Sequence, residues 1–136
     1  MAPIENMDLK ALAAVIQKRE DVLLAYIFGS QGITGRVHTP SSDIDIAVLF
    51  THSPSLRELL SFRADLTRLL KTDSIDLVSL NVASPLLKYE VIVGGRKIYS
   101  RDPLLQSTFE MRTISYFLDT QYLRNIQNQY LLGESA

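Results

Sequence analysis

Cysteine is absent from this chain of 136 residues, and histidine occurs only twice. The lack of cysteine excludes disulfide frameworks, thiolate zinc sites and cysteine nucleophiles. His38 and His52 are too few for a histidine-rich metal site, and we expect both to be solvated loop residues. A metal site built on sulfur or imidazole is therefore not expected.

The chain also lacks a charge excess and long apolar runs. Its net charge is −1, so no basic excess points to nucleic acid, and we expect no direct nucleic-acid binding. No run approaches the roughly 18 apolar residues that a membrane-spanning helix needs. The segment MAPIENMDLK lacks the layout of a signal peptide. We expect a cytoplasmic protein that does not contact a membrane.

The composition is that of an ordinary globular domain. Hydrophobic residues make up 46% of the chain and charged residues 21%, and a domain of this size can bury a core without disulfides. No internal repeat, low-complexity tract or linker interrupts the sequence. We expect one domain, with its core over residues 1–100 and a helical extension of the same domain over residues 101–136.

Apolar periodicity predicts helices that alternate with short strands. Helical spacing predicts a helix over about residues 8–20 with Asp8 as its cap, and a second helix that opens with the capping box of Ser55 and Glu58 and runs to about Lys71. We expect Arg63 and Arg68 to lie on the wet face of this second helix.

A third helix is predicted to open at Ser84-Pro85 and to stop at Gly94-Gly95, because proline suits a first turn and glycine a helix end. Short apolar or alternating runs predict strands over residues 22–28, 43–50, 74–80 and 97–100. Such alternation indicates an α/β or α+β fold, a sheet covered by helices.

The C-terminal stretch from Pro103 to Leu132 contains no further proline and no glycine, which predicts one long helix, broken at most once. Its apolar residues are too many for one narrow stripe, so more than one side must be buried. Two interpretations remain open. The helix either wedges into the core of the domain or shares a surface with a partner protein.

Two carboxylates stand in the second predicted strand, where apolar residues would be expected. Asp43 and Asp45 lie two positions apart, so they project from one face while Ile44 and Ile46 project from the other. Two like charges this close need compensation. Magnesium suits this demand, because it binds one or two carboxylates together with substrate phosphates.

A third aspartate and a Gly-Ser pair, together with the two carboxylates, make up a candidate catalytic site. Asp76 stands between apolar residues in the next strand, whereas the nearby Asp73 has the position of a turn residue. If the strands are neighbours, three carboxylates converge. Gly29 and Ser30 end the first strand, where backbone N–H groups and the serine hydroxyl can hold a phosphate. The set outlines a site for phosphoryl or nucleotidyl transfer.

A Gly-Ser pair, a spacer, D-x-D and a later single Asp on a strand resemble the signature of the polymerase-beta-like nucleotidyltransferase superfamily. The small size and the long C-terminal helix are similar to its minimal nucleotidyltransferase branch and to MntA-type antitoxins of HEPN toxins. The resemblance implies that Asp43, Asp45 and Asp76 are catalytic and bind two Mg²⁺ ions, while Gly29 and Ser30 bind ATP. It also implies transfer of AMP to a tyrosine of a cognate HEPN ribonuclease toxin, held in a hetero-oligomer through the C-terminal helix.

The chain departs from the family pattern in the predicted phosphate loop. Twelve residues, 31–42, separate Ser30 from Asp43, where ten are usual, and Gln31 stands where many members carry arginine. Arg36 is a candidate for the missing positive charge. Two alternatives therefore stay open: a binding module of the same fold that neutralises the toxin by complex formation, and a small-molecule nucleotidyltransferase.

Overall fold

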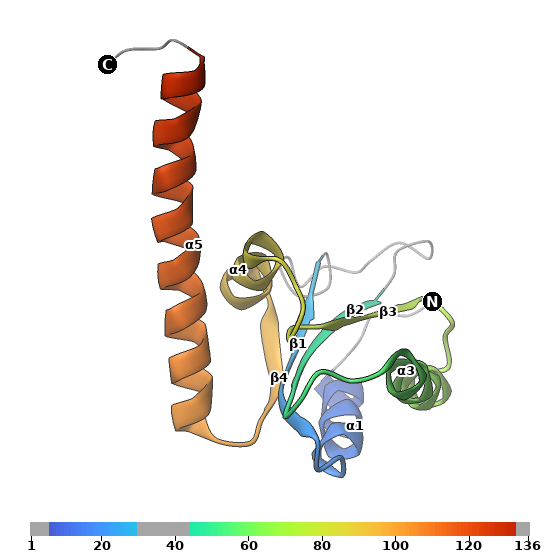
Figure 1. The fold of residues 1–136 in the computed structure, drawn as a ribbon. Coiled ribbons are helices and arrows are strands. Elements are labelled where there is room, and N and C mark those ends of the chain that lie inside the picture. Colours follow the sequence, from blue (N-terminus) through green and yellow to red (C-terminus); the bar gives the residue numbers. More distant parts are fainter. Residues whose placement is uncertain (1–5, 30–43, 133–136) are drawn as a thin grey trace.

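The computed structural model describes residues 6–29 and 44–132 (Figure 1). Its helices and strands follow one another in the order α1 (Asn6–Gln17), β1 (Val22–Phe28), β2 (Ile44–Phe50), α3 (Leu56–Leu70), β3 (Ile75–Ser79), α4 (Pro85–Gly94), β4 (Arg96–Ser100) and α5 (Pro103–Leu131). The predicted α/β architecture with a long C-terminal helix is confirmed, and α5 is continuous.

The four strands form one mixed sheet in the order β3-β2-β1-β4. Strand β1 is antiparallel to both β2 and β4, while β2 and β3 are parallel. A parallel pair needs a crossover connection, and α3 provides it. Consequently β2 and β3 begin at the same edge of the sheet, close to the point where β1 ends.

Helices cover both faces of the sheet (Figure 1). On one face, α1 and α3 pack Leu12, Ile16, Phe62 and Leu66 against the strands, and all four side chains are fully buried. On the other face, Val91 of α4 and partly buried residues of α5 pack on a second cluster. Residues that alternate along β2 are divided between the two clusters, as the period of a strand requires.

The helix boundaries follow the expected local signals in most places. Ser55 accepts from the Glu58 N–H, and the Glu58 carboxylate accepts from the Ser55 N–H at 2.8 Å, so the predicted capping box is present. This backbone hydrogen bond lowers the pKa of Glu58. Helix α4 begins at Pro85 and ends at Gly94, as predicted.

The predicted bounds of α1 are wrong at both ends. The helix already begins at Asn6, so the position of Asp8 lies within it and is not the N-cap position. It ends at Gln17, not near residue 20, because Ile16 is its last fully buried residue and the chain turns there, with Arg19 N–H bonded to the Ile16 carbonyl. A cap preference alone did not fix where this helix starts.

Helix α5 crosses the second face of the sheet and then leaves the domain (Figure 1). One hydrogen bond, 2.8 Å long, joins the Tyr26 hydroxyl on β1 to the Glu110 carboxylate on α5. Burial raises the pKa of Tyr26 well above its ordinary value, and the hydrogen bond to Glu110 and its charge raise it further. None of the helices within residues 6–29 and 44–132 is long and apolar enough to cross a membrane.

Candidate functional site

The strands that carry Asp45 and Asp76 lie side by side, and the two residues are direct partners in the parallel register of β2 and β3. Ile44 and Ile46 on β2 and Ile75 on β3 are buried among α1 and α3. Because side chains alternate along a strand, both aspartates project to the opposite face, the one that carries α4 and α5. The expected convergence of these two carboxylates is thus present.

The end of β1 closes this corner of the sheet. Phe28 is the antiparallel partner of Asp45, and Gly29 follows with a positive φ of 72°. A Cβ at Gly29 would overlap Oδ2 of Asp45. The left-handed backbone therefore favours glycine, and the absence of a Cβ leaves room for the Asp45 carboxylate in its present position.

The remaining predicted ligands lie outside the described residues. These are Ser30 and Asp43, and the same holds for Gln31, Arg36 and His38 of the predicted phosphate loop. Within residues 6–29 and 44–132, no three side chains of histidine, aspartate or glutamate lie together as a metal site. The roles assigned to Ser30 and Asp43 remain predictions.

Arg63 corrects one expectation from the sequence. Its side chain is not on a solvated face, since Nε donates to the Ile75 carbonyl at 2.9 Å and Nη2 donates to the Asp73 carbonyl at 2.8 Å. These bonds tie α3 to the start of β3, one residue before Asp76. Arg63 therefore positions the strand that presents Asp76. By contrast, Arg68 and His52 are exposed, as expected.

A cavity of about 450 Å³ adjoins the glycine corner, between the end of β1 and helix α4. Phe28, Gly29, Tyr89 and Val93 line it together with Glu90 and Gly94. The Tyr89 ring stacks on Phe117 of α5, with ring centroids 4.3 Å apart and planes at 19°. Its partly apolar, aromatic lining next to the carboxylates is suited to a flat organic group. The sequence around Tyr89 carries no sign of this role, because aromatic residues at helical spacing usually belong to a core.

The chemistry of the donor set fits a hard divalent cation. Asp45 and Asp76 offer carboxylate oxygens, the ligand type that magnesium prefers, from adjacent positions on one face. Asp45 is partly buried and Asp76 is exposed. The pair can therefore bind a cation at its inner member and still meet an incoming substrate at its outer member.

A family model described as polymerase beta, nucleotidyltransferase, matches residues 10–104 of the chain. This segment contains α3, α4, the whole sheet, and both Asp45 and Asp76. A comparison with curated proteins found no significant match.

Three solved structures resemble nearly the whole chain. A chain from the complex of tri-AMPylated Shewanella oneidensis HEPN toxin with MNT antitoxin is 23% identical with a TM-score of 0.73, and the match covers 95% of this chain and 99% of that one. A chain from a toxin–antitoxin structure with AMP-PNP is 26% identical with a TM-score of 0.73, covering 92% and 98%. A chain from the MntA–HepT toxin–antitoxin structure is 23% identical with a TM-score of 0.72, covering 94% and 99%. The fold, including the long C-terminal helix, is shared with these proteins.

Proposed function

Because the chain belongs to the polymerase beta nucleotidyltransferase family, we propose that it transfers AMP from ATP to a tyrosine hydroxyl of a cognate HEPN toxin and thereby acts as its antitoxin. The observation that carries this proposal is the pairing of Asp45 with Asp76 beside Gly29, within the matched domain. The 26% identical structure with AMP-PNP supports a nucleotide as the substrate, and the AMPylated HEPN toxin in the other complex supports the acceptor.

Asp45, Asp76 and the predicted ligand Asp43 would hold magnesium. When bound, the metal neutralises the phosphate charge that develops during displacement. Because Gly29 has no side chain of its own, its backbone would be able to approach the triphosphate closely. The aromatic cavity next to it would receive the adenine and fix the α-phosphate near the carboxylates.

The transfer itself is an in-line displacement. The tyrosine oxygen forms a bond to the α-phosphorus of ATP, the bond from that phosphorus to the oxygen bridging to the β-phosphate breaks, and pyrophosphate leaves. The proton of the tyrosine hydroxyl passes to a carboxylate. Asp76 is the group proposed for this step, because it is the more exposed member of the pair.

The test is the mass of a cognate HEPN protein after co-expression with this chain. We expect a gain of one or more AMP units with the wild-type chain and none with Asp45→Asn. Asp73→Asn is the matched control, because Asp73 is a nearby exposed turn residue whose backbone, not its side chain, is bonded to Arg63. Its product should carry AMP as in the wild type.

Two outcomes would contradict the proposal. If Asp45→Asn transferred AMP at the wild-type rate, the Asp45 carboxylate would not be needed for transfer, and the proposed metal site would be wrong. An unmodified HEPN protein in a tight complex with the wild-type chain would instead identify a binding module of the same fold.

A further inference from the structure

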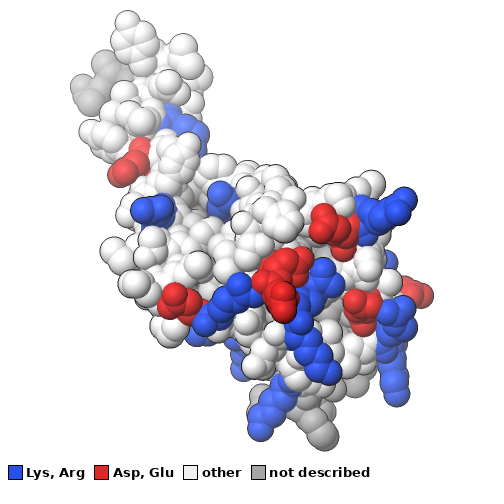
Figure 2. Space-filling model, turned by 60° about the horizontal axis from the view of Figure 1, so that its bottom comes forward, with Lys and Arg blue, Asp and Glu red and all other residues white. Residues whose placement is uncertain are grey.

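Phe117 is the last buried residue of α5, at the point where the helix leaves the domain. Its side chain is only 8% exposed, although it belongs to neither of the two apolar clusters that form the core. Beyond it, every residue from Gln121 to Leu132 is exposed, and Figure 2 shows the projecting helix as mostly white. Packing in the core of the domain therefore does not account for the burial of Phe117.

The Phe117 ring stacks on Tyr89 of α4, with ring centroids 4.3 Å apart. Tyr89 and Val93 stand four positions apart on α4, and both line the cavity of about 450 Å³ beside Gly29. Within the part of the chain that the structure describes, no hydrogen bond fixes the Tyr89 hydroxyl. The stack is thus the contact that orients the Tyr89 ring, and a pair of this kind favours one orientation about fivefold.

Arg124 makes a second contact with the Phe117 ring. It lies seven residues further along α5, on the same side of the helix, and its guanidinium carbon is 5.6 Å from the ring centroid. A cation at this distance is attracted to the aromatic ring and helps to hold it in place. A series of contacts therefore runs from the projecting part of α5 through Phe117 to Tyr89 at the cavity.

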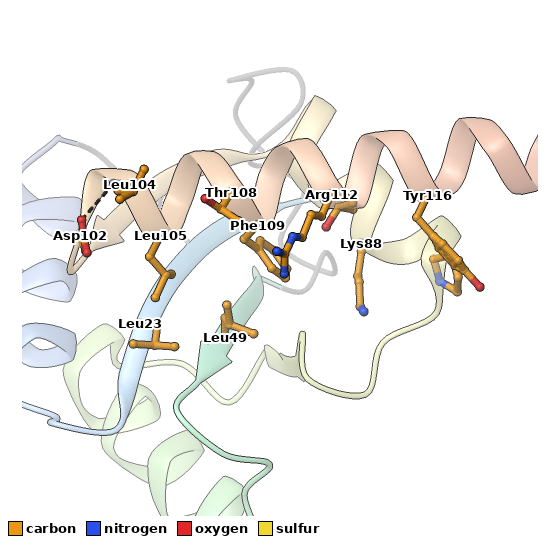
Figure 3. A pocket seen from close by; sticks show the side chains of 12 residues that line it. Leu23, Leu49, Lys88, Asp102, Leu104, Leu105, Thr108, Phe109, Arg112 and Tyr116 are labelled. Atoms are coloured by element: carbon orange, nitrogen blue, oxygen red, sulfur yellow. Dashed lines mark hydrogen bonds between the residues drawn. The ribbon is translucent and has the colours of Figure 1, made fainter.

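A larger cavity, of about 610 Å³, also borders α4, at the first turns of α5. Lys88 of α4 and Phe109 of α5 point into it (Figure 3), whereas the neighbouring Tyr89 lines the smaller cavity. No residue of α5, all of which the structure describes, lines the smaller cavity. Phe117 can therefore act on the smaller cavity through Tyr89 but not directly.

We propose that Phe117 is a positioning residue for the nucleotide: it holds Tyr89 in the orientation in which the tyrosine ring packs against the base of ATP. The way α5 packs on α4 thereby sets the affinity of the cavity for nucleotide. The inference rests on the proposed function for the identity of the ligand in this cavity. Because Phe117 lies away from the carboxylates, its loss should weaken nucleotide binding without slowing the chemical step.

Titration calorimetry with AMP-PNP and Mg²⁺, without an acceptor protein, tests the role of the ring. Phe117→Leu should raise Kd about fivefold, because Tyr89 then occupies other orientations as well. Phe117→Tyr keeps a ring at this position and should bind as the wild type does. Phe117→Met is a second variant without a ring, to be used if Phe117→Leu does not fold. A wild-type Kd in the variant without a ring would overturn the proposal.

Phe109→Leu is the matched control. It makes the same change on the same helix, but at the larger cavity and against the second apolar cluster. Thermal unfolding should show a loss of stability in Phe109→Leu and in Phe117→Leu alike, whereas only Phe117→Leu should bind AMP-PNP more weakly. An equal loss of affinity in both variants would indicate a general effect of destabilising α5 and would overturn the positioning role.

A double-substitution cycle tests the route through Tyr89. Tyr89→Leu should raise the Kd for AMP-PNP at least fivefold, and adding Phe117→Leu to it should raise Kd no further. Additive effects would mean that Phe117 acts by another route and would overturn the proposal. During AMP transfer, Phe117→Leu should raise KM for ATP about fivefold and leave kcat unchanged. A fall in kcat alone would contradict a role in nucleotide positioning.

The binding assay separates this inference from the proposed function. If the wild-type chain binds AMP-PNP and Phe117→Leu binds it more weakly, the positioning role stands even when no HEPN protein gains AMP. If the two chains bind it equally, the positioning role fails, whatever the result of the transfer assay. If the wild-type chain does not bind AMP-PNP, both the positioning role and the proposed function fail.

Discussion

The two faces of the sheet differ in what their helices leave open. On the α1 and α3 face, Phe62 and Leu66 are fully buried, and the cluster around them is a closed core. On the α4 and α5 face, the structure has two aspartates, two cavities and a helix that projects from the domain. Both faces therefore contain a buried cluster that stabilises the fold, but only the second also has polar groups and open space available for chemistry and contact with other molecules.

Asp76→Asn should have the largest effect of these substitutions. It should lower AMP transfer, which depends on the α4 and α5 face, and leave the stability of the fold unchanged. Because Asp76 is the carboxylate proposed to receive the tyrosine proton, its loss should lower AMP transfer about 10,000-fold, equivalent to about 5.5 kcal/mol in the barrier. The melting temperature should stay near that of the wild type, since Asp76 is exposed. Radiolabelled ATP incorporation and thermal unfolding together measure the two effects.

Phe62→Ala, on the α1 and α3 face, should have the opposite result: it should lower stability and leave AMP transfer unchanged. Phe62 is fully buried and meets Phe50 edge to face with ring centroids 6.1 Å apart, so the cavity left behind should cost about 4 kcal/mol of unfolding free energy. Urea denaturation measures this loss. AMP transfer per folded molecule should not change, and a selective loss of transfer would show that the faces are not independent.

Gly29→Ala, at the end of β1 beside Asp45, should lower AMP transfer more than it lowers stability. The new Cβ would meet Oδ2 of Asp45 and the residue would keep a positive φ, so we expect transfer to fall about 100-fold, equivalent to about 2.7 kcal/mol in the barrier. The strain should lower the unfolding free energy by only about 1 kcal/mol.

Tyr26→Phe should have the smallest effect: it removes the hydrogen bond to Glu110, which should cost about 1 kcal/mol of unfolding free energy at neutral pH, and it should change how stability depends on pH in alkali. The pKa of Tyr26 is raised in the folded protein, so the native state keeps a proton that the unfolded chain loses above pH 10. Its contribution to stability is therefore fully present below pH 10 and falls above it, by about 1.4 kcal/mol per pH unit. Urea denaturation between pH 8 and 11 should show this slope in the wild type in excess of that in Tyr26→Phe. Equal slopes would contradict the proposed linkage.

Local signals in the sequence were sufficient to predict most of the fold. The Ser55 capping box and the Ser84-Pro85 opening are short-range features, and the structure has both. The order of the strands depends on contacts between distant segments, so the pairing of Asp45 with Asp76 could be expected only on the condition that β2 and β3 are neighbours.

Other parts of the site had no local signal. An arginine such as Arg63 on a helix surface gives no sign in the sequence that the carbonyls of Asp73 and Ile75, at the start of the next strand, lie within its reach. Tyr89 and the two cavities arise from the way α4 and α5 rest on the sheet, which depends on packing rather than on spacing along the chain. The predictions for Ser30 and Asp43 await a test by substitution.

The stacking of Tyr89 on Phe117 marks the last buried contact that holds α5 to the domain. Thirteen residues separate Phe117 from Tyr130, so about 20 Å of helix extends beyond this contact. A tilt of about 5° there would move the far end by about 1.7 Å, given that length. Small rotations of α5 on the domain would therefore become larger displacements at its tip.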